Sequence, residues 1–278
     1  MRRLAALAIL AVSTACSATA QSVMPQQALA SRPPAEASAE PAHERRGPER
    51  VARGRELARP DQPPLAADIV PILVEDHCVD RDLATPVTAE GVLTILDRSY
   101  GLPPTYVPSD LVAASTAGLD GTSGAKLVRS LLIDDLADMA AAWTAAGLEM
   151  EVESAYRSYA DQAATFDSWV ARLGLDAASM RTARPGHSEH QLGTALDLTS
   201  PGWSGRFGDW AAETAEGRWM AEHGWEYGFV MSYPAGSEAA TCFGYEPWHY
   251  RWIGREAAAE QRASGLALRE YLEGHAGD

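Results

Sequence analysis

The sequence predicts an α+β fold in which helices flank a small antiparallel sheet. In some segments apolar residues recur at helical spacing, and in others they alternate with polar residues. The strand-like segments are separated by helices of uneven length, and no segment repeats another. At 278 residues and 46% hydrophobic composition, the chain is long enough for one sizeable core plus accessory segments.

The N-terminus has the layout of a secretory signal peptide. Residues 1–20 begin with a basic pair, continue with an apolar run and end in an Ala-Thr-Ala sequence. That run is too short to span a membrane, and no later stretch reaches the roughly 18 uninterrupted apolar residues of a spanning helix. We therefore expect an exported, extracytoplasmic protein without a membrane span. Lipid attachment at Cys16 is the alternative to cleavage after Ala20.

Composition distinguishes a linker segment from a folded domain. Residues 21–64 hold eight of the seventeen prolines, are rich in alanine and lack a sustained apolar period, which predicts a disordered linker. Residues 65–278 then form the folded domain. The chain carries a net charge of −15, and the acidic excess falls in this domain. Such a surface repels nucleic acid and anionic lipid, so we expect neither as a partner.

Two cysteines remain after the expected cleavage, Cys78 and Cys242. An even number of cysteines in an oxidising compartment predicts one disulfide. The alternative is a pair of unbonded, buried thiols.

The first long helix is expected over residues 124–147 and ends at Gly147, a residue typical of helix ends. Its apolar face comprises Leu127, Val128, Leu131, Leu132, Leu136, Met139, Ala140 and Trp143. Residues 148–154 follow, in which apolar residues alternate with three glutamates. This alternation predicts a half-buried strand with one face in water.

A second helix is expected to begin after Ser158, because this serine and Asp161 three residues later form a capping signal. The helix ends before Gly174, and its expected buried residues are Phe166, Trp169, Val170 and Leu173. A further strand is predicted within residues 225–231, and a terminal helix over residues 254–272.

An isolated aspartate in a small, apolar strand predicts the site. Pro and Gly at 185–186 break the preceding helix, so residues 187–190, with a histidine at each end, lie in a loop. Residues 193–198 are predicted to form a short strand, in which Asp197 shares a face with the small residues Gly193 and Ala195. Burying a carboxylate there is costly unless it is paired or holds a metal.

The residue types around this strand are those of a catalytic zinc site. His190 precedes Asp197 by seven residues, and Glu246 precedes His249 by three in a segment where Pro247 disfavours helix. Two histidines and one aspartate make the three protein ligands of such a site, with a fourth position open for water. The glutamate then remains free to take a proton from that water. A surface position for this glutamate is the alternative.

Alternative roles are also open for the histidines and for Asp197. His187 could replace His190 as ligand, but we expect it to line the site or to support a ligand. Asp197 could instead form a buried ion pair with Arg157 or Arg184. The remaining histidines, His43, His77, His223 and His275, are not expected to bind metal.

Four motifs in order resemble the VanY-type D-alanyl-D-alanine carboxypeptidases, zinc peptidases of family M15. The motifs are SAYRSYADQ (154–162), PGHSEHQLGTALDL (185–198), YGFVMSYP (227–234) and YEPWHYRWIG (245–254). The likeness extends over about residues 95–272, nearly the whole expected domain. It implies the fold of the Hedgehog and D,D-peptidase type.

This resemblance also implies a role for each site residue. The zinc ligands would be His190, Asp197 and His249, and the catalytic base would be Glu246. Arg157 would stabilise the oxyanion that forms as water attacks the scissile carbonyl, the alternative being a structural ion pair. Gln162 and Ser188 match positions that help hold the terminal D-residue, and Tyr156 and Trp248 are expected to wall the cleft.

The substrate implied by the resemblance is the peptidoglycan stem peptide, from which the enzyme would release the terminal D-alanine. We expect the enzyme to be a monomer. An L,D-carboxypeptidase and an endopeptidase share the same motifs and stay open as alternatives. A zinc-containing wall-binding module without hydrolysis is the alternative from another class. The presence of both Glu246 and Arg157 disfavours it.

Overall fold

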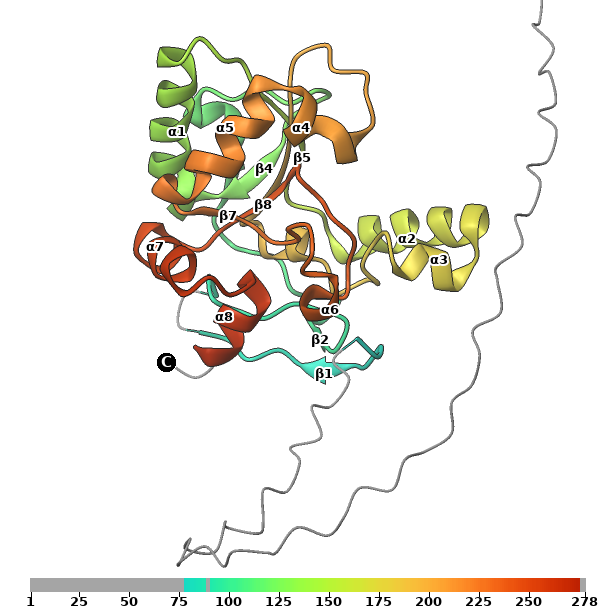
Figure 1. The fold of residues 1–278 in the computed structure, drawn as a ribbon. Helices are drawn as coiled ribbons and strands as arrows, with labels where there is room; N and C mark the ends of the chain where they lie inside the picture. The colour runs from blue at the N-terminus through green and yellow to red at the C-terminus, as the bar shows by residue number, and fades with distance from the viewer. Residues whose placement is uncertain (1–77, 89–90, 276–278) are drawn as a thin grey trace, which may run out of the picture. The chain divides into compact units, whose positions relative to one another are not determined.

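The computed structural model describes residues 78–88 and 91–275 (Figure 1). The predicted signal peptide (1–20), the predicted linker (21–64) and Cys16 lie outside the described residues. None of the described helices combines the length and the apolar character that crossing a membrane requires.

A four-stranded antiparallel sheet forms the centre of the fold, with strand order β5-β6-β8-β7. Its strands are β5 (Glu151–Ser154), β6 (Ala195–Thr199), β7 (Phe229–Met231) and β8 (His249–Trp252). Two strand pairs accompany it, the parallel pair β1 (Leu83–Ala84) and β2 (Tyr100–Gly101) and the antiparallel pair β3 (Leu111–Ala113) and β4 (Leu127–Arg129). The predicted α+β fold with a small antiparallel sheet is therefore confirmed.

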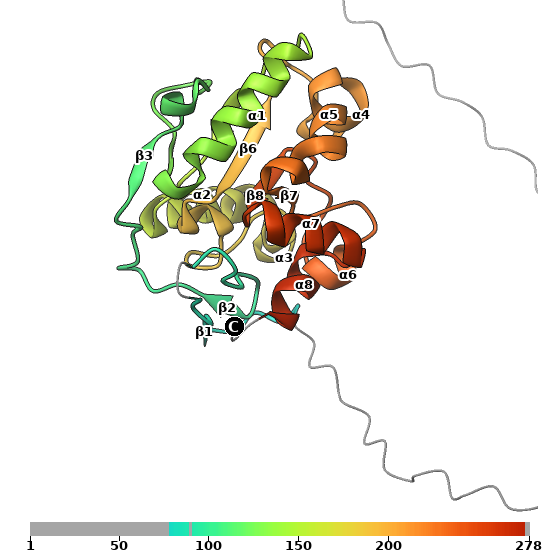
Figure 2. The same cartoon turned by 90° about the vertical axis from the view of Figure 1, so that its left-hand side faces the viewer.

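Helices surround this sheet. They are α1 (Ile133–Ala145), α2 (Tyr159–Leu173), α3 (Leu175–Ser179), α4 (Trp210–Glu213), α5 (Ala215–His223), α6 (Glu238–Thr241), α7 (Arg255–Ser264) and α8 (Leu268–Gly274). Figures 1 and 2 show α1 and α5 on one side of the sheet, whereas α2 and α3 project away from it. Helices α7 and α8 pack on a second, smaller apolar cluster near β7.

The strand register separates the main core from the site. Leu196 of β6 pairs with Tyr250 of β8, and both side chains belong to the main apolar cluster, which includes the buried face of α1. The next residue along β6, Asp197, pairs with His249. Because successive side chains point to opposite faces of a strand, this pair lies on the face away from that core. The predicted orientation of Asp197 is confirmed.

The predicted start of the first helix is wrong. Residues 127–129 form β4 and pair with residues 111–113, and α1 begins only at Ile133. Val128 and Leu132 are fully buried, so the apolar pattern is real. Over so short a segment that pattern fits a strand as well as a helix, and pairing with a distant strand decides between them.

The second predicted helix begins as expected but buries less than expected. Ser158 is its N-cap and accepts a hydrogen bond from the backbone N–H of Asp161, 3.1 Å away. Phe166 is buried, but Trp169 is only partly buried and Leu173 is 43% exposed. The cause is that α2 projects beyond the sheet, so the core does not cover its outer half (Figure 1).

Two other boundaries differ from expectation. The predicted terminal helix is broken into α7 and α8 at Gly265, whose φ of 69° lies in the left-handed region that ends helices. Within residues 225–231 only the last three form a strand, preceded by the 3₁₀ helix Gly224–Tyr227.

Cys78 and Cys242 form a disulfide, as predicted. The bond joins the beginning of the described fold to the end of α6. It therefore anchors the chain a few residues before Glu246.

Candidate metal centre and active-site cleft

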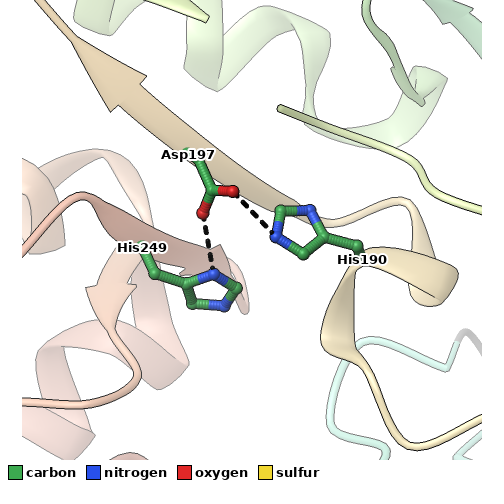
Figure 3. Close-up of side chains that lie close together, drawn as sticks. All are labelled: His190, Asp197 and His249. Carbon is green, nitrogen blue, oxygen red and sulfur yellow. Dashed lines mark hydrogen bonds and ion pairs between the residues drawn. The ribbon is translucent and has the colours of Figure 1, made fainter. Parts of the chain in front are cut away.

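Three side chains from separate elements meet at one point. His190 lies on the 3₁₀ helix η3 (Glu189–Leu192), Asp197 on β6 and His249 on β8. Their ligating atoms all lie within 4.8 Å of one another. Asp197 Oδ2 is 3.1 Å from His190 Nε2, and Asp197 Oδ1 is 3.0 Å from His249 Nδ1. Figure 3 shows the carboxylate between the two imidazole rings.

Local structure explains why these residues converge. The cross-strand pairing of Asp197 with His249 makes their side chains neighbours on one face of the sheet. His190 is delivered by η3, which ends at Gly193 with a φ of 74°. A β-carbon at Gly193 would also lie 3.0 Å from the side chains of Leu111 and Arg129, so this turn favours glycine for two reasons.

The hydrogen bonds of the two rings fit a metal site. His190 Nδ1 is 2.7 Å from the carbonyl oxygen of Ala155, and His249 Nε2 is 2.9 Å from Glu189 Oε2. Each bond occupies the ring nitrogen away from Asp197 and turns the other nitrogen toward it. Two such imidazoles and one carboxylate are the donor set of a catalytic zinc, and these outer hydrogen bonds orient the ligands.

Sequence reasoning missed the pair that holds this arrangement in place, Glu189 and Arg251. Glu189 is 4% exposed, accepts a hydrogen bond from Ser232 Oγ at 2.6 Å and forms an ion pair with Arg251 at 2.9 Å. Burial acts to raise the pKa of Glu189, but the charge of Arg251 and the bond to His249 outweigh it and lower the pKa to about 2. Only their positions in the sequence could have indicated this pair. Glu189 is adjacent to His190, and Arg251 lies two residues after His249.

The ligands themselves form a strongly coupled group. Burial acts to lower the pKa of His249, but its hydrogen bonds with Asp197 and Glu189 raise that pKa to about 10. Burial lowers the pKa of His190. Although burial opposes it, contact with the two histidines holds the pKa of Asp197 well below its usual range. Without a metal, the proton on His249 and the charge of Arg251 together balance the two buried carboxylates, Asp197 and Glu189.

Glu246 lies beside this centre in a cleft of about 960 Å³, whose lining also includes Arg157, Asp197 and Trp248. The loop before β8 fixes its backbone, because its N–H donates to the carbonyl oxygen of Tyr233 at 3.0 Å. Burial, opposed by His249 and reinforced by the two neighbouring carboxylates, raises the pKa of Glu246 to about 8. A carboxyl group with such a pKa can exchange a proton near neutral pH.

Arg157 is held at the edge of the centre by contacts of its guanidinium and of its backbone N–H. Its guanidinium donates to Gln162 Oε1 at 2.8 Å and to Ser154 Oγ at 2.7 Å. It also lies 3.8 Å from Asp197 Oδ2. Its backbone N–H donates to the carbonyl oxygen of His190 at 3.2 Å, which ties this loop to the metal ligand. The arginine is thus a fixed cation lining the cleft.

The four predicted substrate contacts occupy different places. Trp248 lines the cleft and packs edge-on against Phe207, with ring centroids 5.6 Å apart. Gln162 is buried, and its amide nitrogen donates to Ala183 and Thr182 while its oxygen accepts from Arg157. Ser188 is buried, and Tyr156 is partly buried. Among the described residues, only the tryptophan of these four is part of the cleft lining.

His187 does not support the metal centre, contrary to expectation. Its Nδ1 lies 2.8 Å from the carbonyl oxygen of Asp97, and its Nε2 lies 3.4 Å from Asp82 Oδ1. Arg184, the alternative partner for Asp197, pairs with Asp82 instead, at 3.1 Å. The turn after residues 185–186 therefore directs His187 toward the N-terminal part of the fold, away from His190.

A carboxylate and a fixed arginine beside a His-Asp-His centre define a class, the metal-dependent hydrolases. The sequence model of the VanY family, described as D-alanyl-D-alanine carboxypeptidase, matches residues 125–255. YodJ of Bacillus subtilis, named as a carboxypeptidase, is 35% identical over 192 residues, which are 69% of this chain and 70% of YodJ.

Solved structures of carboxypeptidases also resemble this chain. The LdcB LD-carboxypeptidase has a TM-score of 0.61 at 35% identity, covering 66% of this chain and 86% of that one. A mutant of the vancomycin resistance D,D-pentapeptidase VanY in complex with Zn(II) has a TM-score of 0.54 at 30% identity, covering 65% and 98%. The chain belongs to the VanY family of D-alanyl-D-alanine carboxypeptidases, and it is a hydrolytic peptidase.

Proposed function

We propose that the protein is a zinc-dependent carboxypeptidase that removes the terminal D-alanine from peptidoglycan stem peptides. The observation that carries this proposal is the meeting of Glu246, Arg157 and Asp197 in one cleft beside two histidines. Family membership and the Zn(II) complex of a VanY structure support both the reaction class and the metal.

The reaction follows from the positions of these groups. His190, Asp197 and His249 would hold the zinc, which when bound supplies the positive charge that activates water and polarises a carbonyl group. Glu246 accepts the proton of the attacking water and returns it to the leaving amine. The guanidinium of Arg157 stabilises the charge that develops on the carbonyl oxygen.

An L,D-carboxypeptidase is the second candidate. The likeness to LdcB, at 35% identity and a TM-score of 0.61, favours it at least as strongly as the likeness to VanY favours D,D specificity. The residues around the metal centre do not distinguish the two, because both reactions need the same water, base and cation. An endopeptidase would need the same water, base and cation, so these residues do not distinguish it either.

The experiment is mass spectrometry of a pentapeptide, a tetrapeptide and a cross-linked stem peptide, each incubated with the zinc-loaded protein and with a Glu246→Gln variant. Loss of one alanine from a pentapeptide ending in D-Ala-D-Ala, absent with the variant, supports the proposal. Cleavage of only the tetrapeptide would assign L,D specificity, and an internal cut would assign an endopeptidase. If the pentapeptide, the tetrapeptide and a cross-linked peptide all stay intact, the protein is a binding module and the proposal fails.

We also propose that the protein acts as an exported monomer outside the cytoplasm. The signal-like residues 1–20 support export, and the disulfide between Cys78 and Cys242 suits an oxidising compartment. Detection of the processed chain outside the cytoplasm, at a monomer's mass in size-exclusion chromatography, tests this.

Zinc affinity should rise with pH. The pKa of His249 is raised to about 10, so this ring is protonated at neutral pH without metal. Zinc requires the unprotonated Nδ1, so each bound ion displaces that proton, and affinity should increase about tenfold per pH unit between pH 6 and 8. Competition with a chromophoric chelator at several pH values measures this. An affinity that stays constant over that range would contradict it.

A further inference from the structure

The cleft is larger than the chemistry at its floor requires. Of its ≈ 960 Å³, the proposed reaction uses the part beside Arg157, Asp197 and Glu246. The remainder is bounded on one side by Trp169 of α2 with Met180 and Arg181, which follow α3. Volumes of this order hold ligands well beyond a single amino acid.

This outer wall presents apolar surface that the core does not cover. Met180 is 50% exposed, and Trp169 remains partly exposed although its place in the apolar pattern of α2 predicts burial. The guanidinium of Arg172 lies 4.4 Å from the centre of the Trp169 ring and fixes that ring from one side. An ordered, partly exposed tryptophan in a cleft is a natural contact for the body of a peptide.

Arginine side chains in the cleft lining can select for a negatively charged group of the substrate. Three arginines line the cleft, and two of them have partners: Arg157 binds Gln162 and Ser154, and Arg206 pairs with Asp209 at 2.7 Å. Arg181 forms no ion pair within residues 78–88 and 91–275. In a chain of net charge −15, an unpaired guanidinium in a substrate cleft is suited to bind a carboxylate.

We propose that Arg181, with Trp169 and Met180, binds a free carboxylate of the substrate on the acyl side of the scissile bond. This inference rests on the proposed function. A carboxypeptidase substrate has one residue beyond the bond that is cut, so a second carboxylate can lie only on the acyl side. The enzyme therefore prefers stem peptides that carry a free carboxylate there over the same peptides with a carboxamide.

The test compares two synthetic peptides that differ only in this carboxylate or carboxamide. The native protein should show a kcat/KM about tenfold higher for the carboxylate peptide, as expected for one charge-assisted contact. Arg181→Gln should remove this preference by lowering only the carboxylate value, and Arg181→Lys should keep part of it. Arg218→Gln is the matched control, because Arg218 lies on α5, donates to the carbonyl oxygen of Ala212 and does not line the cleft.

Two results would overturn the inference: equal kcat/KM for the two peptides with the native protein, or a preference that Arg181→Gln leaves intact. Calorimetric binding of the same peptides to the zinc-loaded Glu246→Gln protein separates this failure from that of the proposed function. If the native protein cuts neither peptide, the proposed function fails, and the difference in affinity between the peptides still decides the role of Arg181.

Discussion

Replacing Glu246 with glutamine should lower kcat by about 10²- to 10⁴-fold, the range of general acid–base catalysis. Glutamine keeps the size of the side chain and its place in the loop before β8, but it can neither accept nor return a proton. The side chain is not one of the three metal ligands, so zinc should still bind. Steady-state kinetics together with metal content by mass spectrometry measure both quantities.

Glu153→Gln is the matched control for this substitution. Glu153 lines the same cleft, but it accepts a hydrogen bond from Thr122 Oγ1 at 2.6 Å, and no step of the proposed reaction requires it. The kcat of the Glu153→Gln protein should change only slightly. A Glu246→Gln protein that holds zinc and keeps full activity would remove Glu246 from its role as base.

Replacing Arg251 with methionine should lower the free energy of unfolding by about 3–5 kcal/mol, because the buried Glu189 then keeps only His249, which it shares with Asp197, as a cationic partner. Arg251 is fully buried, and it also donates to the backbone carbonyls of Val92 at 2.8 Å and Thr94 at 2.6 Å. Methionine fills similar space but meets none of these acceptors. Chemical denaturation of the metal-free protein measures the change.

The corresponding surface substitution is Arg206→Met, which removes an exposed ion pair with Asp209. Exposed pairs contribute little, so its effect should be far smaller. Adding Glu189→Gln to the Arg251→Met protein should restore part of the lost stability, because the unpaired charge is then gone. If Arg251→Met proved as mild as Arg206→Met, the buried pair would not hold the site together.

The parts of the site that follow from local rules could be predicted from the sequence. Strand alternation placed Asp197 opposite the core-facing Leu196, and the structure confirms this. The convergence of His190, Asp197 and His249 was expected from residue types and the family resemblance, and the structure brings them together. Their role as zinc ligands stays a prediction that metal binding must test.

The parts that depend on distant pairing could not be predicted. Residues 127–129 form a strand only because residues 111–113 lie beside them, and no local signal specifies that partner. The contact between Glu189 and Arg251 likewise requires the register of β8 against β6 and the position of η3. The direction of His187 depends on the turn at residues 185–186, which sequence spacing does not fix.

The most direct measurement is the release of the terminal residue by protein that is first depleted of metal and then titrated with zinc. We expect no hydrolysis without metal and a return of activity that saturates at one zinc per chain. An Asp197→Ala protein, which lacks the carboxylate between the two histidines, should not recover at the same zinc concentrations. Undiminished hydrolysis by the metal-depleted protein would contradict the zinc dependence of the reaction.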